Sequence, residues 1–403
     1  MIVSQILAGG TGTGSGVPLR RAPSGPPGPS FGRVLAFVLV SLSISLGVAC
    51  GSERGDDTVV EVPPADPAAV REYMAGVRLL QKQERRYQRR AMGRFQKAVE
   101  IDPNLWEAHY NIGVLHRREG DLEAASASFD RAITIQPGAS EPLLGAAEVA
   151  YAQGDRDSAA SRLESLVRRA PDNLGARVAL AVILRENESY GPALEQAREV
   201  LIRDPSNICA LLEIGRIYRA REQYDVSQLV LGKAMDLTGD DAPALRAEIQ
   251  NEQGLLELDR GDTQAAFIAF ERAITLDASY KPARMNMGSV LLHAGDYVGA
   301  QAQYDAVLAE HSEDPAARVA LGTSLRGQGE HRRARREYER VLRDHPDHPD
   351  AIFNLGVLRA EFVNERERSR ENFQHFLRVA PRRHPGRETA ERYLREIPAP
   401  GGG

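Results

Sequence analysis

Cysteine is scarce in this chain, because only Cys50 and Cys209 occur among its 403 residues. Two cysteines cannot form the disulfide framework of a small secreted domain. Aromatic residues are also few, at 6%, although the apolar fraction of 42% is enough for a packed core. The chain is instead rich in alanine, glutamate and arginine, a composition typical of closely packed helices. It therefore predicts an all-α protein.

An excess of positive charge is missing as well, since the formal net charge is -5 at pH 7. A general nucleic-acid-binding protein needs a basic surface to neutralise phosphates. Most cations are arginines, and lysine occurs only at Lys82, Lys97, Lys233 and Lys281. The charge balance argues against nucleic acid as a partner.

Signatures of catalysis are absent from the sequence of the main part of the chain. It contains no metalloprotease, Walker, nucleophile-elbow or Rossmann motif, so we expect no enzyme activity, no cofactor and no small-molecule substrate. The segment "RDHPDHPD" sets His345 and His348 among aspartates and could suggest a metal site. Asp, Pro and His are also ordinary turn and capping residues, and we favour that interpretation and predict no metal.

The first 68 residues are unlike the rest of the chain. Residues 1–33 are rich in Gly, Pro, Ser and Thr and form a low-complexity leader. The uncharged apolar run 34–49 follows Arg33 and ends in small residues, the layout of a secretion-signal hydrophobic region. A helix of this length would be about 24 Å long and would not cross the roughly 30 Å hydrocarbon core. A transmembrane helix remains the alternative.

The sequence "LGVAC" at the end of this run resembles the lipobox of bacterial lipoproteins, although Gly47 stands where Leu is preferred. The resemblance implies cleavage before Cys50 and lipidation of Cys50. Gly51 is not the Asp associated with inner-membrane retention, which implies an anchor in the outer membrane, facing the periplasm. Several acyl chains on one residue give stable anchoring. Residues 50–68 then form the lipidated cysteine and a flexible tether.

An internal repeat with a spacing of 34 residues organises the remainder. A small residue recurs at the eighth place of each unit and an alanine at the twentieth, an aromatic residue often follows at the twenty-fourth, and proline closes most units. Two apolar patterns of helical period flank a break such as "REGD" or "HAGD", so each unit is predicted to be a helix hairpin. Small residues let the two helices approach closely, and proline ends the second helix.

This pattern resembles the tetratricopeptide repeat family, with about nine units over residues 69–382. The resemblance implies a right-handed superhelical solenoid of helix hairpins. Residues 383–403 are expected to hold a C-terminal capping helix, over 386–397, and a disordered tail.

In such arrays the first helices of the hairpins line a groove that binds protein partners. The resemblance places eight side chains of this chain on that groove: Asn111, Arg117, Arg185, Arg216, Arg219, Asn286, Arg326 and Asn354. Arginine can grip carboxylates, and an asparagine amide can both donate to and accept from a peptide unit. The hypothesis is a groove for acidic or extended segments. The alternative is that these are only soluble residues on an exposed face.

A cluster of cations, "QKQERRYQRRAMGRFQK", occupies residues 81–97. It could rest on anionic membrane lipid or on a periplasmic partner, or it could be a solvated helix face.

Together these features predict a non-enzymatic, membrane-anchored scaffold lipoprotein that assembles a Gram-negative envelope machine. The chain resembles the myxobacterial gliding-motility lipoproteins with tetratricopeptide repeats. Two alternatives remain: a pilotin-like assembly factor for the secretin of a type IV pilus or secretion system, and a non-catalytic recognition subunit of a glycosyltransferase complex.

Overall fold

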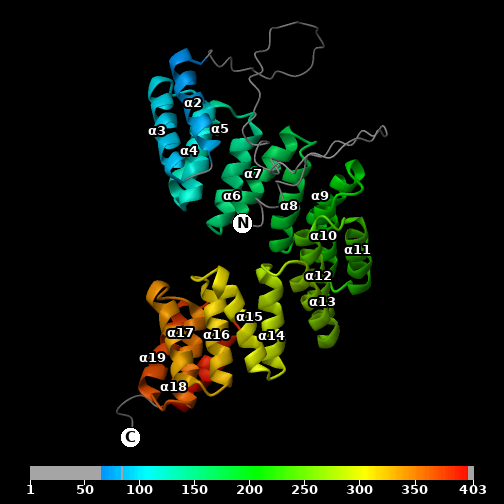
Figure 1. Ribbon diagram of the computed structural model, residues 1–403, viewed down its shortest axis with the longest axis vertical. Coiled ribbons are helices and arrows are strands. Elements are labelled where there is room, and N and C mark those ends of the chain that lie inside the picture. Colours follow the sequence, from blue (N-terminus) through cyan, green and yellow to red (C-terminus); the bar gives the residue numbers. More distant parts are fainter. Residues whose placement is uncertain (1–64, 83–84, 398–403) are drawn as a thin grey trace, which may run out of the picture. The chain divides into compact units, whose positions relative to one another are not determined.

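The computed structural model describes residues 65–82 and 85–397. In this part of the chain all regular structure is helical, with 19 helices and no strand. Contacts between residues divide the chain into two compact units, Met1–Pro205 and Ser206–Gly403. Consecutive helices pair as hairpins within each unit (Figure 1). The predicted all-α fold of paired hairpins is confirmed.

The first unit holds four hairpins, each formed by an even-numbered helix and the helix that follows it. Its helices are α2 (Pro67–Leu80), α3 (Arg85–Ile101), α4 (Trp106–Glu119), α5 (Leu122–Ile135), α6 (Ser140–Ala152), α7 (Arg156–Arg169), α8 (Leu174–Glu186) and α9 (Tyr190–Arg203).

The second unit holds five more hairpins and a final single helix. Its helices are α10 (Ile208–Ala220), α11 (Tyr224–Leu237), α12 (Pro243–Asp259), α13 (Thr263–Leu276), α14 (Lys281–His293), α15 (Tyr297–Glu310), α16 (Pro315–Gly327), α17 (His331–Asp344), α18 (Pro349–Glu361), α19 (Arg366–Val379) and α20 (Gly386–Glu396).

The turns inside the hairpins explain why the helices stop and restart where they do. In the second hairpin, Gly120 ends α4 in the left-handed conformation, with φ of 85°. Asp121 follows, and its carboxylate accepts a hydrogen bond from the backbone N–H of Ala124 at 3.0 Å, which caps α5. Glycine tolerates this conformation without steric cost, and aspartate satisfies a free N–H of the new helix. The "GD" breaks in the sequence are therefore helix-stop and helix-start signals.

Two hairpins place glutamate where five others have this glycine. Glu222 has φ of 58° and Glu188 has φ of 59°. We expect Glu222→Gly to stabilise the α10–α11 hairpin by about 0.5–1 kcal/mol, because it relieves the left-handed strain and loses part of that gain to backbone entropy. Hydrogen exchange of α10 and α11 amides measures the change. The reverse substitution, Gly261→Glu, should destabilise its hairpin by a similar amount, and slower exchange in that variant would contradict the explanation.

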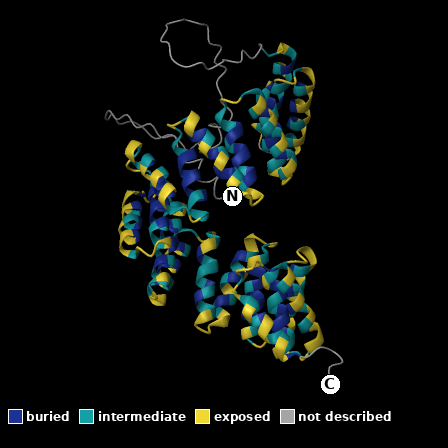
Figure 2. Cartoon of the chain, turned by 180° about the vertical axis from the view of Figure 1, so that it is seen from behind, coloured by how far each residue is buried: buried dark blue, intermediate teal, exposed yellow. Residues whose placement is uncertain are grey.

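The core of most hairpins is a glycine of the first helix packed against a large side chain of the second. A Cβ atom on Gly254 would lie 2.5 Å from the ring of Phe270, and one on Gly288 would lie 2.6 Å from the ring of Tyr304. Figure 2 shows that buried residues follow the sides of the helices that face their neighbours. Because no side chain larger than hydrogen fits beside the ring, the glycine at place eight and the aromatic at place twenty-four act as one packing unit.

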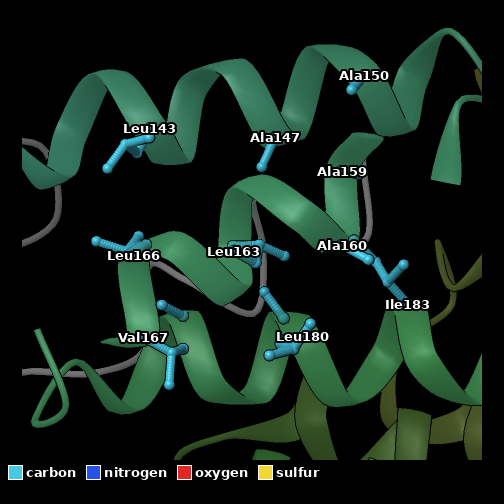
Figure 3. Packing of buried hydrophobic residues seen from close by; sticks show 12 residues of the cluster. Leu143, Ala147, Ala150, Ala159, Ala160, Leu163, Leu166, Val167, Leu180 and Ile183 are labelled. Carbon is cyan, nitrogen blue, oxygen red and sulfur yellow. The ribbon is translucent and has the colours of Figure 1, made fainter. Parts of the chain in front are cut away.

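Where the eighth residue is alanine, the partner is smaller. In the third hairpin Ala147 of α6 pairs with Leu163 of α7, and both are fully buried. The same cluster continues to Leu180 and Ile183 of α8, so it joins one hairpin to the next (Figure 3). A small residue at place eight is therefore kept while the side chain that packs against it varies in size between repeats.

Helix α20 covers the last hairpin. The ring of Tyr393 stacks on that of Phe373 of α19, with centroids 4.8 Å apart. Arg370 of α19 donates hydrogen bonds to the carbonyls of Leu394 and Ile397, at 2.9 and 2.5 Å. An arginine at the C-terminus of a helix satisfies its free carbonyls and favours its dipole. The helix therefore closes the apolar end of the array with a polar outer surface.

A carboxylate that links two hairpins makes stability depend on pH. Asp314 caps α16 through the N–H of Ala317 at 2.8 Å and forms an ion pair with Lys281 of α14. Burial favours the neutral acid, but the hydrogen bonds from Lys281 and the α16 backbone outweigh it and lower the pKa of Asp314. A lowered pKa means that this contribution is present above the ordinary value of about 4 and is lost as the pH falls through the folded value.

We therefore expect Asp314→Ala to destabilise α16 by about 1 kcal/mol at neutral pH, the usual value of a helix cap. The difference from the wild type should shrink as the pH falls from about 4 through the lowered pKa of Asp314, because the folded wild-type carboxylate is protonated there. Thermal unfolding of both proteins between pH 7 and acid conditions measures this, and a difference that stays constant over that range would contradict the role of the charge.

Several sequence predictions fall on residues outside the described part. These are the leader 1–33, the hydrophobic region 34–49, lipidation of Cys50, the tether up to residue 64, and the tail after residue 397. None of the described helices combines the length and the apolar character needed to cross a membrane.

Candidate functional site

The first helices of consecutive hairpins lie next to each other within each unit. Contacts join α4 to α6 in the first unit, and α10 to α12, α12 to α14, α14 to α16 and α16 to α18 in the second. Side chains one repeat apart in sequence therefore meet: Tyr151 of α6 donates to Glu186 of α8 at 2.9 Å, and Asn286 of α14 donates to Asn251 of α12 at 2.8 Å. We call the surface that the first helices form, taken separately in each unit, the first-helix face.

All eight predicted groove residues lie on first helices and are half-buried, neither in the core nor fully exposed. Half-buried polar side chains are the ones that can both contact a neighbouring repeat and meet a ligand. The structure brings Arg216 and Arg219 into one cluster, together with carboxylates, and places the other six separately along the two units.

Arg216 is the centre of a buried ion network in the second unit. Its guanidinium lies 2.6 Å from Glu213 of its own helix, and 2.7 and 2.9 Å from Glu248 and Glu252 of α12. The side chain of Glu213 is only 1% exposed. Burial opposes the charge of Arg216, but Glu252, Glu213 and Glu248 outweigh it and raise its pKa well above the ordinary value. This arginine therefore joins α10 to α12.

Arg219 extends the network by one helical turn. It contacts Asp259 at the end of α12 at 2.9 Å and Glu252 at 3.7 Å. Two guanidinium groups thus face four carboxylates. The surface around α10 and α12 is acidic in balance, and Glu248 and Asp259, with side chains 31% and 41% exposed, present that charge to solvent.

In the first unit the predicted arginines are also paired. Arg117 of α4 forms an ion pair with Glu148 of α6. Arg185 of α8 lies 3.9 Å from Glu186, which also accepts the hydroxyl of Tyr151. Burial and this hydrogen bond raise the pKa of Tyr151 to about 12, so it stays a neutral donor. These contacts again link neighbouring first helices.

The remaining predicted residues differ in their contacts. The amides of Asn111 and Asn354 donate to carbonyls one turn earlier in their own helices, at 2.8 and 2.9 Å, and Asn111 also approaches the hydroxyl of Tyr73 at 3.5 Å. Arg326 of α16 has a buried Nη1 with no hydrogen-bond partner among the described residues.

The prediction from sequence missed the carboxylates that complete this face. Glu248, Glu252 and Asp259 occupy places two, six and thirteen of the sixth repeat, which are among the places that the resemblance assigns to the groove. Choosing only arginine and asparagine at those places left out their partners. Reading every polar residue at the same places would have found them.

The histidines in and around the turn between α17 and α18 stabilise the local structure. Nδ1 of His348 accepts from the N–H of Ala351 at 3.4 Å, while Asp347 and Asp350 contact His375 and His384 at 2.8 and 3.0 Å. The described residues contain no group of three or more His, Cys, Asp or Glu side chains placed to hold a metal ion. The turn residues thus cap α18 and tie it to the segments that follow.

Several solved structures share this arrangement of helices. A tetratricopeptide repeat protein from Parabacteroides merdae ATCC 43184 is 17% identical, with a TM-score of 0.45 over 64% of this chain and 97% of that one. PilW, a widely conserved type IV pilus biogenesis factor, is 15% identical, with a TM-score of 0.47 over 56% and 100%. The APC/C hetero-tetramer Cut9–Hcn1 includes a chain that is 12% identical, with a TM-score of 0.50 over 82% and 76%.

No curated protein sequence matches this chain. Family models do match it: one tetratricopeptide repeat model covers residues 144–208, 212–281 and 319–366, a second covers 257–325, and a third covers 107–138. Together they span more than half of the sequence and agree with the hairpins described above. The chain therefore belongs to the tetratricopeptide repeat family.

Proposed function

We propose that this protein is a membrane-anchored scaffold of a bacterial envelope machine, such as a gliding-motility complex, and that it binds extended segments of partner proteins on its first-helix faces. Tetratricopeptide repeat proteins bind protein and peptide partners. The observation that carries the proposal is the ladder of half-buried polar side chains that repeats from one first helix to the next. A regular row of donors and acceptors matches the regular row of peptide units in an extended chain.

The membrane part of the proposal rests on the sequence before the first hairpin. The apolar run 34–49 and Cys50, with its lipobox-like context, lie shortly before α2. Anchoring at this point keeps the whole repeat array at one membrane surface while leaving its faces free for partners.

The ion pairs change the partner chemistry that we propose for the second unit. Counted alone, the arginines favour an acidic segment, but Arg216 and Arg219 are neutralised by four carboxylates. Glu248 and Asp259 remain open to solvent. We therefore assign to the α10–α12 surface an extended segment that carries a lysine or arginine, because a cation there gains charge-assisted hydrogen bonds.

Co-purification from solubilised membranes tests both parts. Cys50→Ala should shift the protein from the membrane to the soluble fraction or leave an uncleaved precursor. A variant with Glu248→Gln and Asp259→Asn should stay on the membrane and lose a partner that the wild type recovers. The matched control carries Asp236→Asn and Glu271→Gln on exposed second-helix positions and should keep that partner. Equal partner recovery by all three proteins would contradict the binding face.

A further inference from the structure

The first hairpin carries an excess of positive charge, although the chain as a whole is acidic. Residues 65–101 contain nine Lys and Arg residues and four Asp and Glu residues, whereas the whole chain has a net charge of -5. Arg94 and Lys97 are paired with Glu72. Within the part of the chain that the structure describes, no ion pair holds the remaining side chains that form the basic face: Arg71, Arg78, Lys82, Arg89 and Arg90.

Three of these cations share one exposed side of α2 and of the residues just after it. Arg71, Met74 and Arg78 follow one another at three- and four-residue intervals on α2, and Lys82 continues that side just after the helix, so they share one stripe. All four are exposed, and Met74, at 41%, is one of the most exposed large apolar residues of the described chain. The stripe combines cations with an apolar side chain.

The ring of Tyr87 on α3 gathers three cations, one from the segment just after α2 and two from α3. The Lys82 Nζ and the guanidinium carbon of Arg86 both lie 4.8 Å from the centre of its ring, and that of Arg90 lies 5.9 Å away. The negative face of an aromatic ring attracts cations and offsets part of their mutual repulsion. Lys82 at the end of the α2 stripe is thereby held beside two arginines of α3.

The position of the patch in the chain determines what it can reach. The apolar run ends at Ala49 and α2 begins at Pro67. Even fully extended, the intervening residues span at most roughly 60 Å. If the apolar run or Cys50 holds the chain at a membrane, the first hairpin is the part of the array with the least freedom to leave that surface.

We infer that the basic face docks on the anionic phospholipid headgroups of the membrane that anchors the chain. This inference deepens the proposed function, and it rests on the proposed anchor for the proximity of the hairpin to lipid. A lipid surface fits better than an acidic protein because the exposed cations of α2 share one stripe with an exposed methionine, and because the short stretch of chain before α2 keeps this hairpin close to the anchor. Each basic residue close to an anionic leaflet contributes favourable electrostatic free energy that falls off within a Debye length.

Docking would also orient the first unit. A second attachment, at the basic face, restricts how this unit can turn relative to the membrane. The first-helix face of the first unit would then be presented to partners in a fixed direction.

The four lysines of the chain allow a direct test, because each acts as a single reporter. The full chain, purified in detergent, is reconstituted with vesicles of phosphatidylcholine alone or of phosphatidylcholine mixed with phosphatidylglycerol, and is acetylated with a membrane-impermeant reagent. On anionic vesicles Lys82 should react about fivefold more slowly than on neutral vesicles. Lys233, exposed on α11, should react equally on both. High salt should abolish the difference.

Two charge variants complete the design and leave Lys82 intact. Replacing Arg71, Arg78, Arg89 and Arg90 with Gln should remove the protection of Lys82. Replacing the exposed Arg272, Arg332, Arg336 and Arg343 with Gln, the same change of charge in the second unit, should preserve it. Equal Lys82 labelling on the two kinds of vesicle would overturn the inference. Failure of the chain to float with neutral vesicles would instead overturn the anchor, so the two failures are distinguishable.

Discussion

Phe270→Ala is expected to lower the free energy of opening of the α12–α13 hairpin by about 3–5 kcal/mol, the cost of removing a fully buried phenylalanine and leaving a cavity. The ring is 0% exposed and packs with Ala266 and with Val290 of the next hairpin. The loss of stability should therefore extend to α14. Hydrogen exchange of amides in α12, α13 and α14 measures it, and unchanged protection in these helices would contradict the assignment of this ring to the core.

The neighbouring glycine gives a sharper version of the same test. Gly254→Ala should cost about 1–3 kcal/mol, because its Cβ would lie 2.5 Å from the Phe270 ring. Combined with Phe270→Ala, the same substitution should cost little or become favourable, because the ring is gone and alanine is the better helix former. A double-mutant cycle measures the coupling between the two sites. Additive effects would show that the glycine is present for another reason.

Arg216→Met is expected to destabilise the contact between α10 and α12 by about 3–5 kcal/mol, because it leaves the carboxylate of Glu213 buried without its cation. The loss comes from an uncompensated charge and not from a lost packing contact, since methionine fills much of the same space. Hydrogen exchange of α10 and α12 amides provides the measurement.

A second substitution separates these two causes. Replacing Glu213 with Leu in the Arg216→Met protein should recover a large part of the stability, since buried ion pairs are often replaced by apolar residues at little cost. Arg272→Met, on the exposed side of α13, serves as the control and should change stability by less than about 0.5 kcal/mol. If the double variant were no more stable than Arg216→Met alone, the buried charge would not be the cause.

The hairpins could be predicted from the sequence because their determinants are local. Gly254 and Phe270 recur at the same spacing in other repeats, and the "GD" pairs stop one helix and start the next within two residues. The hydrophobic period, the caps and the small residues all indicate the same structure. Because they agree, the fold can be predicted from the sequence.

The charge of the first-helix face was harder to predict from the sequence. The prediction selected Arg216 and Arg219 for their own charge, but that charge is balanced by Glu248, 32 residues away from Arg216, and by Asp259, 40 residues away from Arg219. Such pairs depend on how consecutive repeats pack, which residue type alone does not specify. The places of the repeat that share a face are predictable, whereas the net charge of the face requires all of its residues together.

The most direct test of the account is site-specific photo-crosslinking of the full chain in its native membrane. A photoreactive amino acid at Ser289, on the first helix α14, should crosslink to a partner protein, and the same probe at Arg272, on the exposed side of the second helix α13, should not. The crosslink from Ser289 should weaken in the variant with Glu248→Gln and Asp259→Asn. Crosslinks of equal yield from both positions, or from Arg272 alone, would contradict the claim that the first helices form the binding face.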